Sequence, residues 1–192
     1  MVPSFMKDST PTLVRTIREY SDDARELELD EFVNLHGLGF FVKAPSRPET
    51  APSFDDLTLI SVRPSDVKNT VNATFHVLPI TPSRGYTSAT ITVGRLASND
   101  IQIRDKSISR RHAVVRITQD GRFELMDQDS GNGTSIGDTP LKPGEAYAMP
   151  SESSVTLGSV QLTFVDAGHL MRLVTKVVRL SSIELPSLMP DE

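Results

Sequence analysis

The sequence concentrates hydrogen-bond donors in three polar segments, which contain Gly94-Arg95, Ser109 and Asn132-Gly133. An arginine guanidinium is a planar fork that can pair with two oxygens of a phosphate, and a serine hydroxyl can donate a further hydrogen bond. An asparagine amide can bond to a phosphate or to the main chain of an extended ligand. Glycine allows the backbone to approach a ligand closely. If the three segments converge in the fold, they would hold a small anionic group such as a phosphate.

The charge of the chain is unevenly distributed. Residues 94–122 contain seven basic and three acidic side chains, a net charge of +4 in a chain of net charge −5, so the rest of the chain carries −9. A nucleic-acid-binding protein usually has a broad basic surface with aromatic residues on which bases stack. This sequence has no tryptophan and only three tyrosines. The confined positive charge therefore favours a small anionic ligand, and we expect no nucleic-acid partner.

The elements that must position these donors are short strands. Between residues 39 and 165, apolar residues alternate with polar ones in short runs, and Gly, Asn, Asp and Pro lie at the junctions. Period-two alternation with turns at this spacing is typical of an antiparallel β-sandwich, in which functional residues often lie on loops at one end. The predicted strands are GFFVKA (39–44), LTLISV (57–62), ATITV (89–93), DIQI (100–103), HAVVRI (112–117), RFEL (122–125) and a final pair within SVTLGSVQLTFV (154–165).

The two ends of the chain have a different pattern. Residues from about 10 to 36 are predicted to form two short helices or one broken helix, with Pro11 in the first turn and Gly37 after the last one. In the segment 169–180, apolar residues lie on one helical face and basic residues on the other, although its β-branched residues also fit a strand. As a basic amphipathic helix this segment could contact a membrane or a partner, but we expect it to pack on its own domain.

Composition excludes several kinds of chemistry. The chain has no cysteine, so it can form no disulfide, thiol nucleophile or cysteine-ligated metal site. Its first residues lack the apolar region of a secretory signal, and no apolar run approaches the roughly 20 residues that span a bilayer. These features predict a cytoplasmic protein without a membrane span.

The motif residues also resemble a known family. Gly94-Arg95, the segment SISRRH (107–112) with Ser109 three residues before His112, and Asn132-Gly133-Thr134 occur in the order and spacing of the forkhead-associated (FHA) domain. The resemblance covers about residues 90–165 and extends less securely back to residue 37. It predicts an all-β, FHA-like antiparallel sandwich over 37–166, with a short N-terminal helical extension (1–36) and a C-terminal tail (167–192).

The resemblance implies a function for each motif residue. Arg95 and Ser109 would contact the phosphate of a phosphothreonine peptide, and Asn132 would bond to the peptide main chain. Arg110 occupies a position that often contributes to the contact with the phosphate or with the backbone. The residues that would support the site are Gly94, His112, Gly133 and Thr134. The implied partner is a protein that carries phosphothreonine, either a Ser/Thr kinase or a substrate of one, and no cofactor or metal is expected.

Two positions depart from the family pattern. Ser107 stands where many members carry a cation, and Gly131 stands where many carry a hydroxyl residue. These departures leave open a phosphate-independent interaction module on the same fold.

An enzyme is a further alternative. It would pair Ser109 with His112 and recruit Asp105 or Asp127 as a hydrolase triad. No nucleophile-elbow glycines flank Ser109, and the four histidines are not clustered as metal ligands. We therefore expect no catalytic residues and no metal site.

Overall fold

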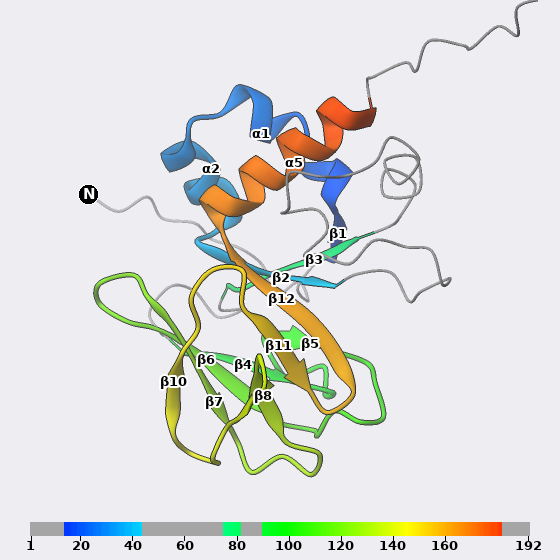
Figure 1. The fold of residues 1–192 in the computed structure, drawn as a ribbon, viewed down its shortest axis with the longest axis vertical. Coiled ribbons are helices and arrows are strands. Elements are labelled where there is room, and N and C mark those ends of the chain that lie inside the picture. Colours follow the sequence, from blue (N-terminus) through cyan, green and yellow to red (C-terminus); the bar gives the residue numbers. More distant parts are fainter. Residues whose placement is uncertain (1–13, 44–74, 82–89, 182–192) are drawn as a thin grey trace, which may run out of the picture.

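The structure, a computed structural model, describes residues 14–43, 75–81 and 90–181. The predicted strand at 57–62 lies outside these residues. The described strands form two sheets that pack face to face (Figure 1). The first sheet has the order β1 (Arg15–Thr16), β3 (His76–Pro79), β2 (Gly39–Lys43), β12 (Val160–Asp166), β11 (Ser154–Leu157), β8 (Thr134–Ile136) and β9 (Thr139–Pro140). The second has the order β10 (Ala146–Ala148), β7 (Phe123–Asp127), β6 (Ala113–Ile117), β4 (Thr90–Gly94) and β5 (Ile101–Gln102).

The predicted antiparallel β-sandwich is confirmed. Apart from the parallel pair β4–β5, all strand pairs in the described residues are antiparallel. Alternate residues of the longer strands enter the core between the sheets, as Ile91 and Val93 of β4 and Val155 and Leu157 of β11 do. Because side chains of a strand alternate between its two faces, the period-two pattern marked these strands in the sequence.

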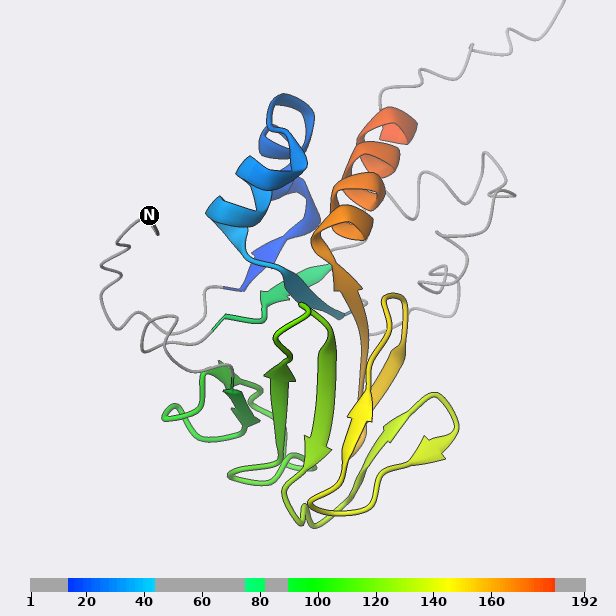
Figure 2. The same cartoon turned by 90° about the vertical axis from the view of Figure 1, so that its left-hand side faces the viewer.

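Helices cover the outer face of the first sheet, at one end of the sandwich (Figures 1 and 2). They are the 3-10 helix η1 (Ile17–Tyr20), α1 (Asp23–Glu26), α2 (Leu29–His36) and α5 (Ala167–Ser181). Strand β2 is buried on both faces, because Phe41 enters the core of the sandwich while Phe40 and Val42 pack in a second core under the helices. The N-terminal segment and the start of α5 thus share one hydrophobic core. Within the described residues, no helix is long and apolar enough to cross a membrane.

The structure differs from the sequence-based expectation at the N-terminal end. Arg15 and Thr16, expected within a helix, form the short strand β1, which pairs with β3 in the register Arg15↔Val77. Thr16 is β-branched, and its backbone gains sheet partners that a short isolated helix would not supply. Helical structure begins only after it, where the Glu19 carboxylate accepts hydrogen bonds from the Thr16 N–H and hydroxyl at 2.6 and 2.8 Å.

The segment after β12, for which the sequence left helix and strand open, is the helix α5. Its apolar side folds back on the domain, with Leu170 and Val174 fully buried against the outer face of the first sheet. At the start of α5 the Asp166 side chain accepts the N–H of His169 at 2.8 Å, which satisfies a backbone donor that the helix itself cannot satisfy. Strand β12 therefore leads directly into the helical layer.

Candidate functional site

Four turns converge at the end of the sandwich that lies away from the helices. Three are the loops 95–100, 103–112 and 128–133, and the fourth is the β11–β12 hairpin at Gly158–Ser159. Backbone and side-chain bonds tie them together: the Gly131 N–H donates to the Ser109 hydroxyl at 3.0 Å, and the Gly158 N–H donates to the Gly133 carbonyl at 3.0 Å. Strand β12 runs from this hairpin to α5, so the helices and the loops occupy opposite ends of that strand (Figure 2).

Ser109 lies where loop 103–112 meets its neighbours. Its carbonyl accepts the Arg95 N–H at 3.0 Å, and its hydroxyl oxygen accepts the Gly131 N–H at 3.0 Å. Because that oxygen acts as an acceptor toward Gly131, the hydroxyl hydrogen is left to donate to a ligand. The side chain is half-buried, so its position is fixed while it stays accessible.

Beneath these loops lies the fully buried imidazole of His112. Its Nδ1 accepts the N–H of Ser109 at 3.0 Å, and its Nε2 lies 3.1 Å from the Gly133 carbonyl. Since a backbone N–H can only donate, Nδ1 must be unprotonated and Nε2 must carry the hydrogen. Burial lowers the pKa of His112, although the Gly133 carbonyl and the Asp127 charge oppose this shift. The neutral ring thus connects loop 103–112 to loop 128–133.

The buried carboxylate of Asp127 organises loop 128–133. It accepts hydrogen bonds from the Ser130 N–H at 2.9 Å, from the Ser130 hydroxyl at 2.6 Å and from the hydroxyl of Thr134. Burial acts to raise the pKa of Asp127, but these hydrogen bonds outweigh it and the pKa is lowered. From the sequence, Asp127 was a candidate only for the acid of a hydrolase triad. The spacing of Asp127 and Ser130, which suits a side chain that bonds to a nearby backbone N–H, could have indicated this loop-forming role.

Ser107 connects three segments. Its carbonyl accepts the Asn132 side-chain amide at 2.8 Å, and its hydroxyl donates to Asp105 at 2.7 Å. The same hydroxyl accepts the Ser159 N–H at 3.0 Å and the Ser159 hydroxyl at 2.8 Å. Ser107, which stands where many members of the family carry a cation, therefore has a structural role. It holds Asn132 by one amide hydrogen and leaves the other hydrogen and Oδ1 for a ligand.

Two glycines permit the close approach of these loops. A Cβ at Gly94 would lie 2.5 Å from the carbonyl oxygen of Arg110, and a Cβ at Gly158 would lie 2.5 Å from that of Ser107. Neither backbone contact could accommodate a side chain. Asn99, which sequence analysis missed, completes the first junction, since its buried amide donates to the carbonyls of Leu96 at 2.9 Å and Arg110 at 2.8 Å.

Arg95 and Arg110 are exposed beside Ser109. Their backbones are fixed, because the Arg95 N–H donates to Ser109 and the Arg110 carbonyl accepts the Leu96 N–H at 3.4 Å as well as the Asn99 amide. Neither guanidinium forms a hydrogen bond or ion pair with a described residue. The donors that were predicted from the sequence therefore lie on adjoining loops at one end of the sandwich. They are Arg95, Ser109, Arg110 and Asn132.

The hydrolase alternative is contradicted by the hydrogen bonds around His112. Both ring nitrogens are occupied by backbone groups, and the Ser109 hydroxyl bonds to Gly131 and not to the imidazole. Asp105 bonds to Ser107, and Asp127 bonds to Ser130 and Thr134. A nucleophile–base–acid chain therefore does not form here. No group of three His, Asp or Glu in the part of the chain that the structure describes could hold a metal ion.

Comparison with known families agrees with this loop geometry. A family model described as the FHA domain matches residues 91–158, which include loops 95–100, 103–112 and 128–133 and end at Gly158 of the β11–β12 hairpin. The chain contains an FHA domain. The match covers β4 to the turn after β11, so the helices at both ends and strands β1–β3 lie outside it.

Curated relatives match less than half of the chain. The chain is 38% identical over 77 residues to the oxoglutarate dehydrogenase inhibitor of Corynebacterium diphtheriae, covering 40% of this chain and 51% of the relative. It is 32% identical over 76 residues to the glycogen accumulation regulator GarA of Mycolicibacterium smegmatis, covering 40% of this chain and 46% of the relative. The chain thus spans about half the length of the curated relatives that it matches.

Solved structures that are similar to this chain include the FHA domain of an Arabidopsis thaliana protein, with 26% identity and a TM-score of 0.41 over 47% of this chain and 73% of that one. The full-length yeast protein Pml1p gives a TM-score of 0.45 with 15% identity, over 73% of this chain and 94% of that one.

Proposed function

We propose that this chain is a cytoplasmic adaptor whose FHA domain binds phosphothreonine on a Ser/Thr kinase or on a substrate of such a kinase. The observation that carries the proposal is the group of donors around Ser109. The guanidinium groups of Arg95 and Arg110 have no described partner, and the Ser109 hydroxyl has a hydrogen to donate. Charge-assisted bonds from such groups are the stronger kind that a phosphate forms.

The remaining motif residues support this assignment as parts of a rigid frame. His112 fixes the backbone of Ser109, Asp127 fixes Thr134, and Ser107 fixes Asn132. Donors that are held in place before the ligand arrives lose little conformational freedom on binding. In this proposal the second amide hydrogen and Oδ1 of Asn132 bond to the ligand's main chain. Gly94 and Gly133 shape the loops that carry the donors.

A phosphate-independent interaction module on the same fold is the second candidate. One observation favours it. Ser107 stands where many family members carry a cation, and its hydroxyl already forms hydrogen bonds with Asp105 and Ser159. Binding of matched phosphorylated and unphosphorylated peptides distinguishes the two candidates, because only the first needs the phosphate.

The first expected result concerns the phosphorylated residue itself. We predict that a phosphothreonine peptide binds about 10- to 50-fold more tightly than the matching phosphoserine peptide. This factor lies within the gain in affinity that is typical of one methyl group buried in a fitted pocket. The phosphate contacts are the same for both, so only the γ-methyl group differs. Titration of four peptides that differ only at this residue, carrying phosphothreonine, phosphoserine, phosphotyrosine or plain threonine, measures the preference.

The peptides with plain threonine and phosphotyrosine are the controls in that titration, and neither is expected to bind measurably. Equal affinity for plain threonine and phosphothreonine would support the phosphate-independent module. Equal affinity for phosphothreonine and phosphoserine would show that no pocket for the methyl group exists, and would leave the phosphate contacts in place.

A second expected result concerns Gly131. A Cβ at this exposed residue would lie 3.8 Å from the Ser109 hydroxyl oxygen, an ordinary contact distance, and its φ is not in the left-handed region. Gly131→Thr should therefore fold normally and add one hydroxyl beside the phosphate donors. One further hydrogen bond is worth about 0.5–1.5 kcal/mol, so binding of the phosphothreonine peptide should tighten about 2- to 10-fold by calorimetry.

Gly133→Thr is the matched control, because it places the same side chain on the other side of Asn132. The φ of Gly133 is +76°, a conformation that β-branched residues rarely adopt. This variant should lose thermal stability, whereas Gly131→Thr should not. Weaker binding by a stable Gly131→Thr variant would place the phosphate away from Gly131.

A further inference from the structure

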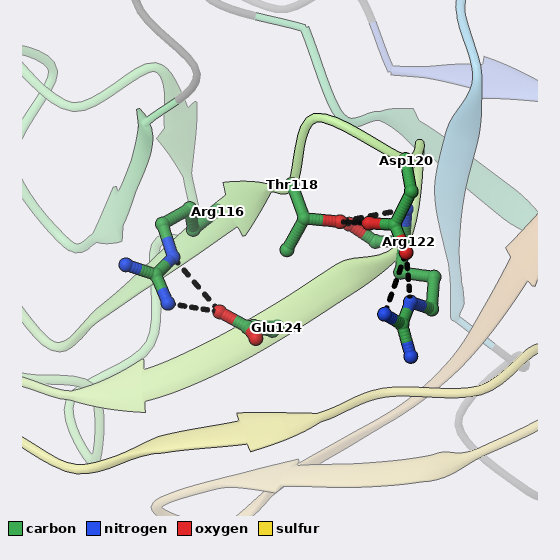
Figure 3. A network of polar contacts seen from close by, with 5 residues as sticks. All are labelled: Arg116, Thr118, Asp120, Arg122 and Glu124. Atoms are coloured by element: carbon green, nitrogen blue, oxygen red, sulfur yellow. Dashed lines mark hydrogen bonds and ion pairs between the residues drawn. The ribbon is translucent and has the colours of Figure 1, made fainter.

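Cations of the β6–β7 hairpin are paired with carboxylates of the same hairpin (Figure 3). Arg116 on β6 faces Glu124 on β7 as a cross-strand pair, and its Nε donates to the Glu124 carboxylate at 2.8 Å. At the tip, the Arg122 Nε donates to the Asp120 carboxylate at 2.6 Å. The positive charge of this hairpin is therefore balanced within it.

The cations of the site loops differ. Arg95, Lys106, Arg110 and Arg111 are all exposed, and none forms an ion pair or side-chain hydrogen bond with a described residue. Arg104, the fifth cation of these loops, contacts only the neutral side-chain oxygen of Gln102, at 3.3 Å. Five cations thus lie close together in sequence, and none of them forms an ion pair with a residue that the structure describes.

The carboxylates of the same loops are directed to other partners. Asp100 accepts the Thr92 N–H at 2.8 Å, and Asp105 accepts the Ser107 N–H at 2.8 Å. Hydrogen bonds from the Ser107 hydroxyl and N–H lower the pKa of Asp105, so it stays charged while it serves the loop. Asp129 of loop 128–133 forms no ion pair with a described residue.

These cations lie on the loops that carry the donors of the site. Arg95 and Arg110 flank Ser109, whereas Lys106 precedes Ser107, whose carbonyl holds Asn132. Cations therefore lie next in sequence both to the phosphate donor Ser109 and to Ser107, which holds Asn132. One phosphothreonine, with a charge of about −1.5 to −2, cannot pair directly with all five cations.

We infer that the ligand of this FHA domain is a phosphothreonine set in an acidic segment, whose Asp or Glu side chains pair with the cations of the site loops that the phosphate does not reach. The inference rests on the proposed function, because it places the phosphothreonine at Arg95 and Ser109. Additional phosphates next to the first would offer the same negative charge, and the experiment includes them separately.

The test compares phosphothreonine peptides of equal length whose flanks carry two glutamates, two glutamines, two lysines or a second phosphothreonine. Each exposed charge pair is worth about 1.5- to 5-fold in affinity, so the glutamate peptide should bind roughly 2- to 25-fold more tightly than the glutamine peptide, and the lysine peptide more weakly. The difference should shrink in 1 M salt, where the screening length falls to about 3 Å. Equal affinity of the glutamate and glutamine peptides would overturn the inference, as would a gain from the second phosphothreonine alone.

Two variants that lose the same charge locate the effect. Lys106→Gln should reduce the advantage of the glutamate peptide about 1.5- to 5-fold and leave the glutamine peptide unchanged. Arg116→Gln removes a cation that Glu124 already pairs, so it should change neither peptide. An advantage that both variants reduce equally would reflect the overall charge of the domain and would overturn the inference.

The same titrations separate this inference from the proposed function. If no phosphothreonine peptide binds, or if the unphosphorylated glutamate peptide binds equally well, the proposed function fails and the inference fails with it. If the glutamine and glutamate peptides bind equally, only the inference fails. Displacement of the glutamate peptide by a single-stranded oligonucleotide, with a salt dependence that spans many phosphates, would overturn the inference in favour of a nucleic-acid surface.

Discussion

Arg95→Ala is expected to weaken binding of a phosphothreonine peptide by about 10- to 150-fold, since a hydrogen bond to a charged group is worth about 1.5–3 kcal/mol. The guanidinium is exposed and has no described partner, so its only expected role is toward the ligand. The melting temperature of the variant should stay that of the wild type. Calorimetric titration together with thermal unfolding measures both quantities.

Arg95→Lys and Arg116→Ala are the matched controls. Lysine keeps the charge but lacks the planar fork, so it should bind with intermediate affinity. Arg116→Ala removes an arginine from the hairpin, where Glu124 pairs it, and should leave binding unchanged. Wild-type affinity in a folded Arg95→Ala variant would show that the phosphate binds elsewhere.

His112→Ala is expected to lower the free energy of unfolding by about 3 kcal/mol, because a buried polar group left without its partner typically costs about 1–3 kcal/mol and the lost ring leaves a void. The Ser109 N–H would lose its acceptor, and the Gly133 carbonyl would keep only its bond to Gly158. For a chain of this size, the melting temperature should fall by roughly 6–12 °C. Phosphopeptide affinity should also fall, because loops 103–112 and 128–133 are no longer joined.

The control for His112→Ala is His76→Ala, which removes an exposed histidine from β3 and should barely change stability. A His112→Ala variant with unchanged stability and abolished binding would contradict the structural role and indicate direct ligand contact.

The pH dependence of stability provides a second measurement on His112. Burial lowers its pKa in the folded protein, so the unfolded chain binds the proton more readily. Its contribution to stability is therefore complete above the unfolded pKa of about 6.5, and it is lost as the pH falls through the lower pKa of the folded state. The difference in unfolding free energy between wild type and His112→Ala should decrease over that interval. A difference that stays constant from pH 7.5 to the acid limit of folding would contradict it.

The strands of the sandwich were largely predictable because each carries a local signal. The alternation at Ile91 and Val93, and again at Val155 and Leu157, predicted β4 and β11. Strands β3, β8, β9 and β10 were not predicted. These short strands form because they pair with neighbouring strands, most of which are distant in sequence, as β3 pairs with β2 and β10 pairs with β7.

For the site, the sequence by itself determined which residue types are present: the forks of Arg95 and Arg110, the hydroxyl of Ser109 and the amide of Asn132 are donors in any fold. It also determined the turns that bear them, because glycine and asparagine favour such backbone conformations locally. Only the tertiary structure decided that Ser107 is a connecting residue and that Asp127 is a support. Asn132 is 25 residues from Ser107 in sequence and Ser159 is 52 residues away, and both bond to it. Hydrogen bonds between such distant residues exist only after the two sheets have packed, and a local sequence pattern carries no information about that packing.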